Sequence, residues 1–176
     1  MTTQVIDNFL SDKNLLDSFF QKYINEGRIH FAFRNQGEPT DLPHSFCSSK
    51  DSSDFCLPLI YDVYKKILQI NDNNKYEIYR WHINIHPTGF DGTIHYDNEG
   101  NVPTYLYCCT PDWKPEWGGE FIVYDENREA RTATSFKEDR LIIFNGSLPH
   151  RAVAPIRLSS LLRVTIAYQC KECSIK

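Results

Sequence analysis

The sequence has no long apolar run. None of its 176 residues belongs to a stretch that approaches the ~20 residues needed to cross a bilayer. The N-terminus, MTTQVIDNFLSDKN, also lacks the basic region and apolar stretch of a secretory signal. We therefore expect a cytoplasmic protein with no membrane partner.

An excess of basic residues is also missing. The 19 Lys and Arg residues are outnumbered by 23 Asp and Glu, the net charge is −4 at pH 7, and the longest basic run is Lys65–Lys66. Because phosphate binding relies on Lys and Arg concentrated on one face, the composition argues against a nucleic-acid partner. It leaves the oligomeric state open.

Tightly spaced cysteine pairs are scarce. The six cysteines include one Cys-x-x-C, formed by Cys170 and Cys173, and Cys47 and Cys56 are conceivable zinc-binding partners for it. The irregular spacing and the lack of a second tight pair weaken that interpretation. A cytoplasm keeps thiols reduced, so we expect six free thiols.

No internal repeat or interdomain linker divides the sequence. The length suits one domain with a sizeable core, and 14% aromatic residues argue against disorder. We interpret residues 1–176 as a single domain, with helical support and a lid in residues 1–75 and a β-rich core in residues 76–169.

The N-terminal part predicts a helix that Ser11 caps and Gly27 ends. Apolar residues recur about every four positions within it, at Leu15, Leu16, Phe19, Phe20, Tyr23 and Ile24. The next segment, RIHFAF (28–33), is predicted to be a strand.

Residues 34–54 are rich in Pro, Gly, Ser and Asp and have no period. An irregular segment of that length is either disordered or a functional lid. A second helix is expected to begin with Pro58 in its first turn. Its apolar stripe consists of Ile60, Val63, Tyr64 and Ile67.

From residue 76 onward the pattern is one of short strands separated by turn residues. The predicted strands are YEIYRWHINIH, TIHYD, PTYLYCCT, GEFIVYD, RTATSF, RLIIFN, HRAVAPI and LLRVTIAYQ. Such a series indicates a β-sandwich or jelly roll, and two preceding helices would cover one outer face of a sheet. The predicted fold is mostly β with supporting helices, a jelly-roll core preceded by two N-terminal helices.

The strand expected at residues 76–86 has one polar and one apolar face. Arg80, His82, Asn84 and His86 alternate with Trp81, Ile83 and Ile85. The apolar face suits the helices. By periodicity alone, the polar face fits the barrel interior and the solvent equally well.

The stretch TIHYDNEG places His95 and Asp97 one residue apart. In extended chain such residues project to the same side, and His150 follows at the start of a late strand. Two imidazoles and a carboxylate form the facial triad of non-haem Fe(II) oxygenases, which leaves coordination positions open. The alternatives are ordinary loop polarity for the first pair and a surface role for His150.

In the last predicted strand, Arg163 and Thr165 share the face opposite Leu162, Val164, Ile166 and Tyr168. An arginine inside a barrel is costly unless an anion meets it, and a carboxylate fits its planar fork. If the anion is 2-oxoglutarate, Arg163 pairs with its distal carboxylate. The alternatives are an internal salt bridge, or Arg157 as the anchor, although Arg157 lies in a predicted turn.

Four segments, in order, resemble motifs of a known family: HPTGFDGTIHYD, WGGEFIVYD, FKEDRLIIFNGSLPHRAVAPI and LRVT. The sequence from about residue 76 to 169 is similar to the 2-oxoglutarate/Fe(II) dioxygenases, specifically the prolyl-hydroxylase-like group. This resemblance implies a double-stranded β-helix, with Fe(II) at His95, Asp97 and His150. It also implies 2-oxoglutarate on Arg163 with Thr165 beside it, O2 as a substrate, and ascorbate as a candidate reductant.

Two positions depart from the family pattern. His86 stands where the family often has a tyrosine before its turn. Cys108 stands where relatives carry a tyrosine that binds the co-substrate, although a one-residue slip would put Tyr107 there instead. His86 and Cys108 are therefore candidate co-substrate contacts, and the triad is unaffected.

The resemblance implies hydroxylation of an unactivated C–H bond, with 2-oxoglutarate converted to succinate and CO2. A prolyl residue of a protein or peptide is the leading substrate, and a free amino acid or other small molecule is the alternative. A jelly roll that binds metal or carboxylate without catalysis is the alternative of another class, because fold alone does not fix function.

Overall fold

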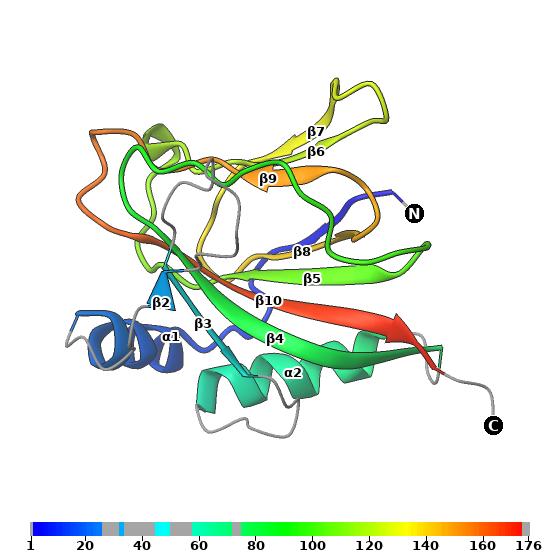
Figure 1. The fold of residues 1–176 in the computed structure, drawn as a ribbon. Coiled ribbons are helices and arrows are strands. Elements are labelled where there is room, and N and C mark those ends of the chain that lie inside the picture. Colours follow the sequence, from blue (N-terminus) through cyan, green and yellow to red (C-terminus); the bar gives the residue numbers. More distant parts are fainter. Residues whose placement is uncertain (1, 26–31, 34–44, 50–57, 72–74, 174–176) are drawn as a thin grey trace.

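The computed structural model describes residues 2–25, 32–33, 45–49, 58–71 and 75–173, which form two antiparallel sheets and the helices beside them. Figure 1 shows both helices on one side of the larger sheet and the smaller sheet on the other. The strand orders are β1-β8-β5-β10-β4-β3-β2 in the larger sheet and β7-β6-β9 in the smaller. This arrangement confirms the predicted jelly-roll core with helical support.

The strands of the larger sheet, in spatial order, are β1 (Gln4–Ile6), β8 (Leu141–Asn145), β5 (Pro103–Cys108), β10 (Arg163–Glu172), β4 (Tyr76–His86), β3 (Ser45–Ser49) and β2 (Ala32–Phe33). Those of the smaller sheet are β7 (Ala130–Thr134), β6 (Phe121–Tyr124) and β9 (His150–Ala152). Strand β10 pairs with β4 on one edge and β5 on the other, so it is central to the larger sheet.

The first helix differs from its prediction in its cap and in the helix type of its second half. Asp12 is the N-cap, because its carboxylate accepts from the Leu15 backbone N–H, whereas the Ser11 hydroxyl donates to the Asn8 carbonyl. Helix α1 (Lys13–Phe19) continues as a π-helix, η1 (Phe20–Asn25). Gly27, the expected stop, lies outside the described residues.

Helix α2 (Pro58–Ile70) begins at Pro58, as predicted. A 3-10 turn, η2 (Pro115–Trp117), is the remaining helical element of the described chain. None of the helices in the described residues has the length and apolar character required to span a membrane.

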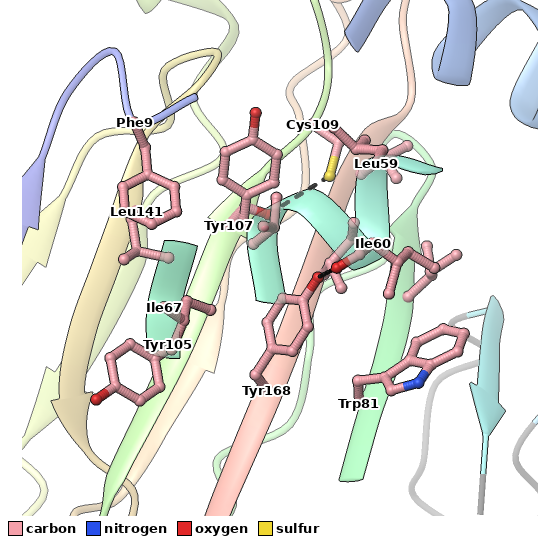
Figure 2. Packing of buried hydrophobic residues seen from close by; sticks show 14 of the residues in the cluster. Phe9, Leu59, Ile60, Ile67, Trp81, Tyr105, Tyr107, Cys109, Leu141 and Tyr168 are labelled. Atoms are coloured by element: carbon pink, nitrogen blue, oxygen red, sulfur yellow. Dashed lines mark hydrogen bonds between the residues drawn. The ribbon is translucent and has the colours of Figure 1, made fainter. Parts of the chain in front are cut away.

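The core between the helices and the larger sheet is continuous and apolar. Ile60, Val63 and Ile67 of α2 are fully buried against the outward side chains of the sheet, including Tyr168 of β10 (Figure 2). The Tyr168 hydroxyl donates to the Ile60 carbonyl at 2.8 Å, so the one polar atom this side chain buries is satisfied. This core fixes which face of the sheet is left for the other layer.

Two expectations for the connecting segments need correction, and a third is confirmed where it is described. Residues 45–49, predicted to be irregular, form β3 and pair with β4, while 34–44 and 50–54 lie outside the described residues. Of the strand predicted at 28–33, residues 32–33 are described, as β2. The segment TIHYD is no strand, because it touches its neighbour through a single bridge, His95 to His150.

Free thiols are found at every described cysteine side chain, namely Cys108, Cys109, Cys170 and Cys173. The side chains of Cys47 and Cys56 lie outside what the structure describes. A zinc site that includes them is therefore not tested by the structure.

Candidate metal centre and co-substrate cavity

His95, Asp97 and His150 meet at the edge of the space between the two sheets. One ligand atom from each lies within 4.8 Å of the others. Reciprocal backbone hydrogen bonds of 3.0 Å join His95 to His150, so two segments far apart in sequence are held side by side. The predicted triad is thus brought together in space.

Both imidazoles are oriented by backbone carbonyls. Nδ1 of His95 lies 2.8 Å from the Thr93 carbonyl, and Nδ1 of His150 lies 2.8 Å from the Leu148 carbonyl. A carbonyl only accepts, so Nδ1 carries the proton of each neutral ring, and Nε2 of the neutral ring then has a lone pair for a metal. This arrangement fixes the tautomer that a divalent metal requires.

The Asp97 side chain is 7% exposed, and that of His150 is 3% exposed. Oδ2 of Asp97 lies 3.4 Å from Nε2 of His150, and its Oδ1 lies 3.8 Å from Nε2 of His95. Burial opposes ionisation of Asp97, but in the metal-free protein a proton on the facing Nε2 of His150 or His95 outweighs it and holds the pKa of this carboxyl well below its usual value. The carboxylate is therefore ionised at neutral pH.

A glycine allows Asp97 to approach the end of β8. The Asp97 backbone N–H donates to the Gly146 carbonyl at 2.8 Å. A Cβ at position 146 would stand 2.6 Å from the Asn98 amide and 2.7 Å from the Thr104 hydroxyl. Any larger residue would push the turn away from the carboxylate.

Gln169 also holds Asp97, and sequence reasoning missed it. Its Nε2 donates to Oδ1 of Asp97 at 2.6 Å, and its own side chain is 4% exposed. The signal was available, because Gln169 lies on the same face of β10 as Arg163 and Thr165 by simple alternation.

A cavity of about 500 Å³ opens beside the three residues. Its wall includes the alternate residues of β4 that were predicted to form one polar face, namely Arg80, His82, Asn84 and His86. It also includes the inward residues of β10, namely Arg163, Thr165, Ala167 and Gln169. The polar face of β4 therefore points into the barrel, and its apolar face packs on the helix side, with Trp81, Ile83 and Ile85 in that core.

Arg163 lies in the cavity wall with 0% of its surface exposed. Its Nε donates to the Gly119 carbonyl at 2.8 Å, and its guanidinium carbon lies 5.1 Å from the centre of the Phe136 ring. Nη1 and Nη2 have no hydrogen-bond partner in the part of the chain that the structure describes. Burial lowers the pKa of Arg163 to about 10, which still leaves it charged at neutral pH.

Gly119 provides the space in which Arg163 is seated. Its φ of +81° is in the left-handed region, and a Cβ there would stand 2.9 Å from Trp113 and 3.3 Å from Cδ of Arg163. The Gly-Gly pair at 118–119 therefore permits a close approach. Trp113 and Trp117 belong to the apolar cluster between the sheets and serve as packing.

The rival interpretations of Arg163 find no support. Within the described part of the chain, no carboxylate forms an ion pair with it. Arg157 is exposed and lies outside the cavity wall, as expected for a turn residue. Thr165 is fully buried beside the cavity, and no described residue forms a hydrogen bond with its hydroxyl.

The two remaining candidates differ in position. His86 lines the cavity and pairs with Arg163 across the strands. Cys108 pairs with Thr165 but is not part of the cavity wall; burial in the apolar cluster raises the pKa of its thiol to about 11. Tyr107 faces the helices and its hydroxyl donates to Asp139, so a register slip does not bring it into the cavity.

Residues 71–168 match the family model of the 2OG-Fe(II) oxygenase superfamily, where 2OG denotes 2-oxoglutarate. The match covers more than half of the chain, and the chain belongs to this superfamily. No curated protein matches the sequence.

Solved structures share the fold at low sequence identity. A prolyl-4-hydroxylase from Pseudomonas putida has a TM-score of 0.65 and 15% identity, over 96% of this chain and 92% of that one. A prolyl hydroxylase from Trichoplax adhaerens, in complex with a hypoxia inducible factor peptide, has a TM-score of 0.68 and 19% identity, over 96% of this chain and 82% of that one. A non-haem alpha-ketoglutarate-dependent epimerase of nogalamycin biosynthesis has a TM-score of 0.64 and 10% identity, over 96% of this chain and 77% of that one. At these identities the likeness shows the fold alone.

Proposed function

We propose that this chain is a 2-oxoglutarate- and O2-dependent Fe(II) dioxygenase that hydroxylates an unactivated C–H bond, with a prolyl residue of a protein or peptide as the leading substrate. The observation that carries the proposal is one cavity with two features. It holds a His-Asp-His group whose ligand atoms lie within 4.8 Å of one another, and a buried guanidinium whose outer nitrogens have no hydrogen-bond partner among the described residues.

The residues present fit the metal and the co-substrate that the superfamily implies. His95, Asp97 and His150 would hold Fe(II), because two imidazoles and one carboxylate suit this ion and leave positions open. Arg163 would bind the distal carboxylate of 2-oxoglutarate, since a buried cation without a partner is costly until an anion reaches it. The hydroxyl of Thr165, in the same cavity wall, would donate to the same carboxylate.

The bound metal and co-substrate supply the oxidation of the C–H bond, and the chain supplies orientation and exclusion of water. Phe121 and Phe144 pack on the His150 ring with centroid distances of 5.5 and 4.6 Å, which keeps that side of the site dry. The His95 side chain is 52% exposed, so the site is open to substrate from the opposite side.

A prolyl substrate is supported by two observations. Prolyl hydroxylases are among the proteins that share this fold. Tyr96 lines the cavity while 61% exposed, so an aromatic ring is available at its mouth for an apolar ring. An epimerase shares the same fold, so the fold alone does not determine the substrate. A free amino acid is the second candidate substrate.

The test is turnover of 2-oxoglutarate in the presence of Fe(II), O2 and one candidate substrate at a time. Prolyl peptides and free amino acids are screened in parallel for succinate formation and for a mass increase of one oxygen atom. We expect both signals with prolyl peptides. Hydroxylation of free amino acids alone would move the substrate assignment to the second candidate. Tight binding of metal and 2-oxoglutarate without succinate from any substrate would favour a non-catalytic jelly roll.

A further inference from the structure

The cavity contains a second arginine that the metal and co-substrate do not use. Arg80 of β4 lines the cavity. Its cross-strand partner on β10 is Gln169, which donates a hydrogen bond to Asp97. The cross-strand partner of Arg163 is His86, which lies six residues after Arg80 on β4. The two arginines therefore lie about 20 Å apart along the strands, at opposite ends of the polar face.

A bulge in β4 sets the direction of the chain at Arg80. Gln169 pairs with Arg80 and the next residue, Cys170, pairs with Ile78, so Tyr79 is the extra residue of the bulge. Ile78 and Trp81 both pack in the helix-side core. The Tyr79 hydroxyl lies 3.3 Å from the Asn98 side chain, next to Asp97. A bulge of this kind re-aims side chains and is common beside active sites.

No carboxylate neutralises Arg80 within the described residues. Its neighbours Glu77 and Glu172 lie on the same two strands, but the ion pair in that region is between Lys171 and Glu77. Among the described residues of the cavity wall, Asp97 is the one acidic residue. It is already held by Gln169 and faces the two histidines.

The charges of the loaded site show what Arg80 lacks. The two positive charges of Fe(II) and the one of Arg163 balance Asp97 and the two carboxylates of 2-oxoglutarate. The positive charge of Arg80 is left over, in a partly buried position where an opposite charge is favoured. The planar fork of an arginine suits a carboxylate in particular.

We propose that Arg80 binds a carboxylate of the substrate, so that this enzyme selects substrates with an anionic group close to the carbon that reacts. The inference rests on the proposed function and narrows its substrate class. The carboxylate has two sources: the α-carboxylate of a free amino acid or of a peptide C-terminus, and an acidic side chain next to the target residue.

The test measures binding to the protein loaded with Mn(II) and 2-oxoglutarate without O2, so that no turnover is needed. Three pairs of probes differ only by a carboxylate or its neutral amide: L-proline and L-prolinamide; acetyl-alanyl-proline and its C-terminal amide; and a blocked prolyl-aspartate peptide and its asparagine counterpart. The pair with the largest preference identifies the source of the carboxylate.

We expect the carboxylate member of at least one pair to bind roughly tenfold or more tightly, since a charge-assisted bidentate pair is among the stronger polar contacts. Arg80→Gln should abolish this preference while the affinities for Mn(II) and 2-oxoglutarate stay as they were. Arg80→Lys should restore part of it. Arg131→Gln, which changes an exposed arginine of β7, should leave it intact.

Equal binding within all three pairs would overturn the proposal, and so would a preference that survives Arg80→Gln. Failure of the proposed function looks different, because the unaltered protein would then either not bind Mn(II) and 2-oxoglutarate or form no succinate with any substrate in the turnover assay. The retained affinities in Arg80→Gln also show that the variant is folded.

Discussion

Strand β10 presents two unlike faces. Toward the helices it turns Val164, Ile166 and Tyr168, all fully buried, and the one hydroxyl among them is hydrogen-bonded to α2. Toward the cavity it turns Arg163, Thr165 and Gln169, which are also buried but keep four polar atoms without hydrogen-bond partners among the described residues. An unsatisfied buried polar atom costs about 1–3 kcal/mol.

The difference shows how one strand divides two tasks. The helix face gains stability from apolar contact, whereas the cavity face gives up stability and keeps its hydrogen-bonding capacity for a ligand. Substitutions on the helix face should therefore change the free energy of unfolding. Substitutions on the cavity face should change binding.

The largest effect is expected at the triad. Alanine at His95, Asp97 or His150 should abolish stoichiometric binding of a divalent metal, because two ligands do not complete the site. Anaerobic titration with Fe(II) or Mn(II) measures this. Glu126→Ala, which removes an exposed carboxylate, is the control. Unchanged metal affinity in all three variants would contradict the assignment of the site.

Arg163→Ala should reduce the affinity for 2-oxoglutarate by more than roughly a hundredfold while metal binding persists, because losing one partner of a buried charge pair costs about 3–5 kcal/mol. Lysine should rescue only part of the loss. The matched control is Arg157→Ala, at the exposed arginine of the preceding turn. A large loss there beside normal affinity in Arg163→Ala would reverse the assignment.

On the helix face, Ile166→Ala should lower the free energy of unfolding by about 2–5 kcal/mol, since it opens a cavity in a closed core. Metal affinity of the folded protein should not change. Urea unfolding gives the first quantity and titration the second. Leu68→Ala, at a residue of α2 that is 42% exposed, should cost less than about 1 kcal/mol.

Gln169→Leu should weaken metal binding by about tenfold or somewhat more, the usual cost of removing a group that orients a ligand. The side chain keeps its volume but no longer donates to Oδ1 of Asp97. Gln169→Glu should be worse, because it places a second carboxylate against the first. Metal affinity equal to that of the unaltered protein in both variants would make the hydrogen bond irrelevant.

The smallest effect has the opposite sign. Arg163→Met should raise the free energy of unfolding of the metal-free and co-substrate-free protein by about 1 kcal/mol or more, because it replaces an unpaired buried charge with an apolar chain. Adding 2-oxoglutarate should stabilise the unaltered protein and leave this variant unchanged. If Arg163→Met instead lowered the free energy of unfolding, contacts within the ligand-free protein would already stabilise the guanidinium, and the prediction would be wrong.

Short-range patterns were enough to predict the polar face of β4 and the meeting of His95 with Asp97. Both follow from the two-residue repeat of extended chain. The arginine of β10 was found because a charge inside an apolar strand needs an explanation. These features belong to single segments, so a sequence carries them without a three-dimensional arrangement.

What escaped prediction depends on contacts between distant segments. The hydrogen bond from Gln169 to Asp97 joins residues 72 positions apart. The pairing of residues 45–49 with β4 is also long-range, because nothing in their polar sequence favours a strand. At the first helix, Asp12 and Ser11 are both good caps, and the chain enters the helix so that only Asp12 reaches the Leu15 N–H.

The central position of β10 has a consequence for exchange with solvent. The strand is hydrogen-bonded along both edges, to β4 and to β5, and it carries Arg163 near one end and Gln169 near the other. Backbone amides in such a strand exchange with deuterium only when the whole domain unfolds. The distance between Arg163 and Gln169 is therefore kept when the loops open locally. Sequence changes in the loops should alter which molecules enter the cavity, while the distance between these two residues stays the same.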